Sequence, residues 1–155
     1  MEKSGTALLL GANLLVLLVV GQFDKSLVGR KRLDGYLPKD FDLLAETVAP
    51  FRRNLTTPHL LAEVSNLTDQ CVPKHRHREF REFLRGSIIP QLDEQWVPAE
   101  QICRTSEFMQ LGLADAAVCH LADEKCLVLS VDLELCGALW GRGVNAENFN
   151  HLRDH

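Results

Sequence analysis

Three acidic residues stand at positions from which they could share one active site. Asp132 follows directly after the apolar run CLVLS, and Asp115 lies in the first turn of a helical pattern. Glu63 lies one turn into the helix that is predicted after the short run NLTT. Because the carboxyl ends of parallel strands meet at one edge of a sheet, we expect these three carboxylates to converge there.

Converging carboxylates repel one another unless a cation lies between them. Oxygen ligands without histidine or cysteine favour Mg²⁺ or Mn²⁺ over Zn²⁺. Such a site activates water and stabilises the charge of an in-line phosphoryl transfer. The alternative interpretation of each residue is structural, because a single Asp in the first turn of a helix is commonly a cap or a dipole partner.

The opening run TALLLGANLLVLLVVG is expected to supply a strand whose carboxyl end lies at this site. It is shorter than the roughly 20 apolar residues of a membrane span, and its end lacks the small-x-small pattern of a cleaved signal. We therefore expect no membrane segment. The run splits into a buried strand over 6–10, a turn at Gly11-Ala12-Asn13, and a buried helix over 14–20 that Gly21 caps.

The rest of the chain alternates between strand and helix patterns. Further strands are predicted over 54–57, 96–98, 126–130 and 144–149. Helices are predicted over 38–49, 59–70, 75–86, 99–112, 113–125 and 132–143, with a loop or frayed helix over 23–36. This alternation indicates one α/β domain over 1–155, a mostly parallel sheet covered on both faces.

Composition is that of an ordinary globular protein. The 155 residues are 46% hydrophobic and 25% charged, with a formal net charge of -4. A dedicated phosphate binder is usually basic, but an enzyme that holds cations among carboxylates can be acidic overall. The five cysteines include no C-x-x-C pair, which favours buried free thiols over a zinc site or a disulfide framework.

Five segments together resemble the PIN domain family, in order and over nearly the whole chain. They are LLLGANLLVLLVVG, TTPHLLAEVSNL, LGLADAAV, LSVDLEL and NAENFNHLR. The resemblance implies a three-layer α/β/α fold with a central parallel sheet. It also implies an Mg²⁺- or Mn²⁺-dependent ribonuclease, often the toxin of a toxin–antitoxin pair.

The resemblance assigns roles to individual residues. Glu63, Asp115 and Asp132 match the acids of the family, which hold the metal. Ser130 matches the hydroxyl of a Thr/Ser-x-Asp motif, and Asn13 matches the Asn of the Asp-x-Asn turn after the first strand. The partners implied are an RNA substrate, an antitoxin protein and a second copy of the chain in a homodimer, in the cytoplasm.

Gly11 departs from the family pattern, since active members carry an Asp at that position. Three explanations stay open: an engineered change, a natural loss, or replacement by another acid, for which Asp24 and Asp34 are the nearby candidates. The leading interpretation is a PIN-type ribonuclease impaired by Gly11. The alternative is a non-catalytic PIN-like module that binds RNA or a protein.

Two further groups of residues have both a functional and a structural interpretation. The basic stretch KHRHREFREFLR, 74–85, either holds RNA phosphates or forms a solvated helix face paired with its own glutamates. His59 is either a general base or a residue that orients the turn before its helix. Trp96, Trp140 and Phe149 are expected in the core or at an interface rather than as stacking platforms.

Overall fold

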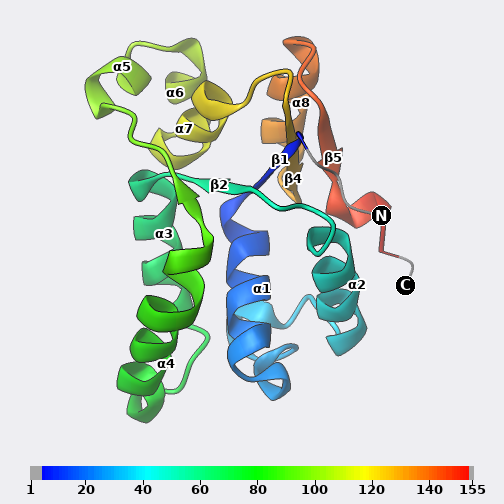
Figure 1. Ribbon diagram of the computed structural model, residues 1–155, viewed down its shortest axis with the longest axis vertical. Coiled ribbons are helices and arrows are strands. Elements are labelled where there is room, and N and C mark those ends of the chain that lie inside the picture. Colours follow the sequence, from blue (N-terminus) through cyan, green and yellow to red (C-terminus); the bar gives the residue numbers. More distant parts are fainter. Residues whose placement is uncertain (1–4, 154–155) are drawn as a thin grey trace.

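Five parallel strands form the central sheet, in the order β3-β2-β1-β4-β5 (Figure 1). In the computed structural model, residues 5–153 are described. The first four and the last two residues of the predicted domain 1–155 lie outside them. The strands are β1 (Ala7–Leu10), β2 (Asn54–Thr56), β3 (Asp93–Glu94), β4 (Cys126–Ser130) and β5 (Ala146–Asn148).

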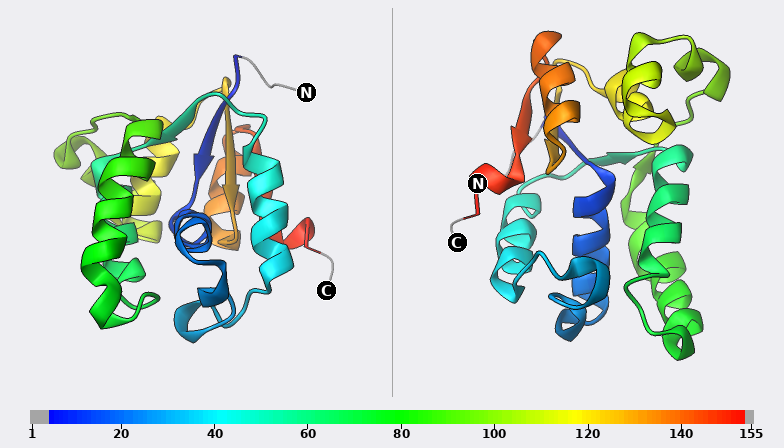
Figure 2. Two further views of the ribbon diagram at one scale, coloured as in Figure 1. Left: turned by 60° about the horizontal axis from the view of Figure 1, so that its bottom comes forward. Right: turned by 180° about the vertical axis from the view of Figure 1, so that it is seen from behind.

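Helices cover both faces of the sheet and make the three-layer α/β/α fold that the sequence predicted. Helix α1 lies in front of β1 and β4, and α8 lies behind them (Figure 2, left). The α-helices among the described residues are α1 (Ala12–Phe23), α2 (Pro38–Val48), α3 (Pro58–Thr68), α4 (His77–Phe83), α5 (Ala99–Cys103), α6 (Ser106–Leu111), α7 (Leu113–Leu121) and α8 (Leu133–Gly141).

The two central strands are apolar on both faces because helices cover both. Leu8 and Leu9 of β1 are fully buried, and so are Val128 and Leu129 of β4. The strands pair in register, with Leu9 opposite Val128 and Leu10 opposite Leu129. A run of aliphatic residues without alternation is the pattern expected of such a strand, and the sequence predicted both β1 and β4 from it.

Helix α1 differs from its prediction at both ends. It begins at Ala12, so the predicted three-residue turn is reduced to Gly11 alone. It also continues through Gly21 to Phe23, so the predicted C-terminal cap is wrong. Gly21 is buried inside the helix because the Phe41 ring of α2 packs directly on it, where a Cβ atom would overlap the ring.

Three other predicted segments lie differently. The third strand is Asp93–Glu94 rather than 96–98, because β3 pairs with Leu55 and Thr56 before the chain leaves the sheet. The helix predicted over 99–112 is two helices, divided where Thr105 caps α6 by accepting a hydrogen bond from the Phe108 N–H. The helix predicted to stop at Gly86 continues from α4 as a π-helical turn over 84–88.

The remaining short elements are single turns. The segment predicted as a loop or frayed helix contains two 3₁₀ turns, Lys25–Leu27 and Lys31–Leu33. Four of the cysteines are buried free thiols, as expected, whereas Cys103 is exposed.

The contact between Gly21 and Phe41 makes a prediction about stability. Gly21→Ala is expected to lower the free energy of unfolding by about 1–3 kcal/mol, because overpacking outweighs the better helix propensity of alanine. Gly137→Ala in α8 is the matched control, since its new methyl group would meet no atom within 4 Å. That change is expected to stabilise by about 0.5–1 kcal/mol. Urea unfolding of both variants checks this, and equal effects at the two positions would contradict it.

Candidate functional site

The candidate site lies where the strand order reverses. From β1 the chain proceeds outward to β2 and β3, and it then returns to β4 on the other side of β1. In open α/β sheets, ligands bind outside the carboxyl ends of the strands at such a switch point. Here the two strand ends are joined by a hydrogen bond of 2.9 Å from the Gly11 N–H to the Leu129 carbonyl.

Gly11 and Ser130 are in close contact at this edge. A Cβ atom on Gly11 would lie only 2.9 Å from the Ser130 Oγ atom. The backbone of Gly11 is extended, with φ -66° and ψ 164°, so its conformation does not itself require glycine. Glycine at position 11 therefore matters because it makes room for the Ser130 hydroxyl.

Ser130 and Asp132 build the turn between β4 and α8. Ser130 is 3% exposed, and its Oγ atom accepts a hydrogen bond of 3.0 Å from the Asp132 N–H. Asp132 is the N-cap of α8, and its Oδ1 atom accepts a hydrogen bond of 3.1 Å from the Leu135 N–H. Asp132 thus has the structural role of a cap, while its position still brings a negative charge to the switch point.

Asp115 is the residue that shows the convergence of the carboxylates. It lies in the first turn of α7, and its pKa is raised from 3.8 to about 6. Burial is the largest cause, and the negative charges of Asp132 and then Glu63 add to it. The charges of Asp132 at the start of α8 and of Glu63 on α3 therefore both act on Asp115 of α7.

Asn13 and Glu63 are the more exposed candidates. Asn13 lies on the exposed side of the first turn of α1, two residues after Gly11. Glu63 is exposed on the second turn of α3. Helix α3 packs against α7, which explains how the charge of Glu63 reaches Asp115.

The donor chemistry of these residues fits a hard cation. All of the converging groups are carboxylates, and their mutual repulsion is what a divalent cation would relieve. Within residues 5–153, however, no three side chains of His, Cys, Asp or Glu come together closely enough to hold a metal ion. The arrangement suits an ion held by one or two protein carboxylates and otherwise by water, as is typical of Mg²⁺.

Asp24, a candidate replacement for an acid at position 11, lies far from that position. It follows α1, whose 12 residues put it about 18 Å from the start of that helix. There it pairs with Arg76 at 2.6 Å and accepts hydrogen bonds from Ser26, which together lower its pKa to about 2. Asp34 is exposed beyond the second 3₁₀ turn of the same segment.

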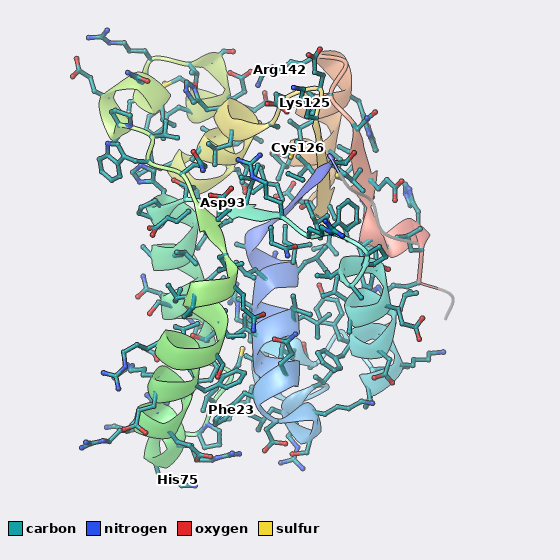
Figure 3. All side chains as sticks on the ribbon, viewed as in Figure 1. Phe23, His75, Asp93, Lys125, Cys126 and Arg142 are labelled. Atoms are coloured by element: carbon teal, nitrogen blue, oxygen red, sulfur yellow. The ribbon has the colours of Figure 1, made fainter. Side chains whose placement is uncertain are left out.

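The basic stretch over 74–85 lies away from the carboxylates. Figure 3 shows His75 at the opposite end of the molecule from α5, α6 and α7. Three of its four arginines pair with acids: Arg76 with Asp24 and Glu79, Arg78 with Glu82, and Arg81 with Asp69. The structural interpretation of this stretch, a solvated helix face, is therefore the better one.

The aromatic residues divide between the core and the surface. Phe149 is fully buried, as predicted, and Trp140 is 45% exposed with its Nε1 donating to the Ala146 carbonyl at 2.8 Å. Trp96 is 70% exposed, so of the two predicted places, core or interface, the core is excluded for it. Its backbone follows β3, where the chain leaves the sheet.

Two threonines at the end of β2 were missed by sequence reasoning. Thr56 and Thr57 are fully buried, and their hydroxyl oxygens have no hydrogen-bond partner among the described residues. Burying an unpaired hydroxyl costs free energy, so its presence beside the switch point is a feature that packing alone does not explain. The only signal in the sequence was their β-branched shape, which predicted the strand.

Comparison of the chain with protein-family models, with curated proteins and with solved structures finds no match. Across residues 5–153, no helix has the length and apolar character needed to cross a membrane. The fold and the candidate site therefore rest on the geometry described above.

The raised pKa of Asp115 predicts how stability depends on pH. The folded protein binds this proton more tightly than the unfolded chain, so the free energy of unfolding falls as the pH rises from about 4 to about 6. Asn at this position carries no charge. Asp115→Asn is therefore expected to stabilise by on the order of 1–3 kcal/mol at pH 7, and by much less at pH 4.

Urea unfolding at the two pH values measures this difference. Asp132→Asn is the companion variant, because Asn keeps the capping oxygen and removes the charge that raises the pKa of Asp115. NMR titration of the Asp115 carboxyl should then show a lower pKa. An unchanged pKa in that variant would mean that the two carboxylates do not interact.

Proposed function

We propose that this chain is a metal-dependent ribonuclease of PIN type, impaired in its present form by Gly11. One observation carries the proposal: at the switch point of a parallel sheet, Asp115 lies half-buried with its pKa raised, first by burial and then by the charges of Asp132 and Glu63. A half-buried Asp115 that feels the charges of two further acids is a costly arrangement for stability. That cost is understandable if the site serves to bind a cation.

Asp115 and Asp132 are the residues that would hold Mg²⁺ or Mn²⁺, and Glu63 would act through water. When bound, such an ion supplies an activated water and stabilises the charge on the phosphoryl group during transfer. Ser130 fixes the turn that presents Asp132, through its hydrogen bond with the Asp132 N–H. Asn13, exposed at the start of α1, is placed where it could orient the RNA backbone.

Gly11 removes one carboxylate from this set. A bound ion would then be met by one negative charge fewer. Asp115 and Asp132 alone would place the attacking water less firmly, and a misplacement of about 1 Å can cost about 10²-fold in rate. This is why the proposal describes an impaired enzyme rather than a fully active one.

Restoring the acid tests the proposal. Gly11→Asp with Mn²⁺ is expected to cleave a mixed RNA pool about 10²-fold faster than the native chain, because the additional ligand orients the attacking water. Gly11→Asn is the matched control, since it has the same shape and no charge. Both must displace the Ser130 hydroxyl to a similar extent.

Gel analysis of the RNA, with circular dichroism to confirm folding, gives the result. Cleavage by the Asp form alone supports the proposal. Cleavage by all three forms would mean that Gly11 does not impair the enzyme. No cleavage by any folded form would exclude the ribonuclease.

A second candidate function is a non-catalytic PIN-like module that binds RNA or a protein. Gly11 and the lack of a three-residue metal group among residues 5–153 favour it. It predicts binding that is indifferent to a chelator and unchanged in Asp115→Asn. The ribonuclease predicts instead that Mn²⁺ raises the melting temperature of the native chain and that Asp115→Asn abolishes this increase. Thermal unfolding with Mn²⁺ and with EDTA therefore separates the two candidates.

The same resemblance suggests the partners and the location that we propose. The partners are an antitoxin protein and a second copy of the chain in a homodimer, and the location is the cytoplasm. A protein contact is supported by Trp140 and Leu152, which are 45% and 41% exposed beside the edge strand β5. Light scattering of the purified chain measures whether it forms a dimer.

A further inference from the structure

Trp96 is a large exposed ring whose position is fixed from both sides. The Gln95 N–H donates to the Thr56 carbonyl at 2.8 Å, which ties the residue before it to β2. Val97, the residue after it, is 3% exposed and packs in a small cluster with Ile102 and Ala116. The indole itself is 70% exposed. Its backbone is therefore ordered although the ring buries little surface of its own.

His59 supports one face of the indole. The two rings are stacked, with centroids 6.0 Å apart and planes inclined by 30°. The His59 Nε2 atom is 2.8 Å from the Val97 carbonyl, so the imidazole is held by the same segment that carries the tryptophan. This contact gives His59 a structural role toward the segment after β3, whereas the prediction was that it orients the turn before its own helix. The imidazole covers one face of the indole, and the rest of the indole remains exposed to solvent.

The stacked pair lies beside the carboxylates. His59 and Glu63 are four residues apart on α3, so they are neighbours on the helix surface, with Cβ atoms about 5–6 Å apart. Glu63 in turn acts on the pKa of Asp115. The exposed ring of Trp96 is thus connected to the candidate site through neighbouring side chains, first His59 and then Glu63.

We propose that Trp96 is a stacking platform for an unpaired base of single-stranded RNA, and that it positions the neighbouring phosphate at the carboxylates. This inference rests on the proposed function, because it assigns the substrate class of the same site. Stacking on an aromatic ring accepts every base, since every base has a π-face. The side chain on which the indole stacks, His59, is polar. A protein-binding hot spot would instead lie within a packed apolar patch.

Binding of a short fluorescein-labelled single-stranded RNA of mixed sequence tests the inference. Fluorescence anisotropy is measured with the native chain in Mg²⁺ and again in EDTA, and a gel confirms that the RNA stays intact. Trp96→Ala is expected to weaken binding by about 5- to 150-fold, the loss of one stacked base. Trp96→Phe should keep most of the affinity, because it keeps an aromatic face.

Met109→Ala is the matched control, since Met109 is an exposed apolar side chain, 82% exposed, on α6. It should bind RNA as the native chain does. Thermal unfolding of Trp96→Ala should also match the native chain, which separates a binding role from a structural one.

Three outcomes would overturn the inference: native affinity in Trp96→Ala, an equal loss in Met109→Ala, or no RNA binding by the native chain. The test does not depend on cleavage. If RNA binding requires Trp96 but Gly11→Asp cleaves nothing, the ribonuclease fails while the RNA platform stands. If Gly11→Asp cleaves and Trp96→Ala binds normally, only the platform fails.

Discussion

The pairing of β1 with β4 is the constraint on which the rest of the structure depends. Both strands are buried on both faces, so they can exist only with a helical layer on each side. Their register places the end of β1 next to the end of β4 and so brings Gly11 against Ser130. The helices α7 and α8 then bring their acids to that same edge. A fold built for apolar burial thereby concentrates negative charge at one point.

The repulsion among these charges lowers the stability of the folded protein, although the same charges would favour the cation binding that we propose. Asp115 holds its proton well above the usual range for an aspartate, because burial and two neighbouring carboxylates oppose its ionised form. Near neutral pH the ionised site is a local source of repulsion, while the surrounding strands and helices supply the rigidity that tolerates it. A site of this kind is neutralised either by protons or by a metal cation, and the two compete.

Much of this could be predicted from local patterns. The buried strands β1 and β4 were visible as uninterrupted aliphatic runs, and the three acids were visible from their places after strands and at helix starts.

What could not be predicted depended on contacts between distant segments. Gly21 has the appearance of a cap in the sequence, and only the Phe41 ring explains why it is inside a helix. The place of β3 depended on its pairing with β2, and a two-residue strand has too little pattern to locate. The stack of His59 on Trp96 joins residues 37 apart in the chain, and no spacing rule connects them.

The contact between Gly11 and Ser130 couples the side chains that these two positions can hold. A side chain at position 11 must share space with the Ser130 hydroxyl, and that hydroxyl is bonded to the turn that carries Asp132. The two positions are therefore epistatic: the effect of an acid at position 11 depends on which residue and which rotamer stands at position 130. A change at one of these positions is therefore expected to be tolerated best together with a change at the other. The turn that presents Asp132 must readjust whenever position 11 gains a side chain.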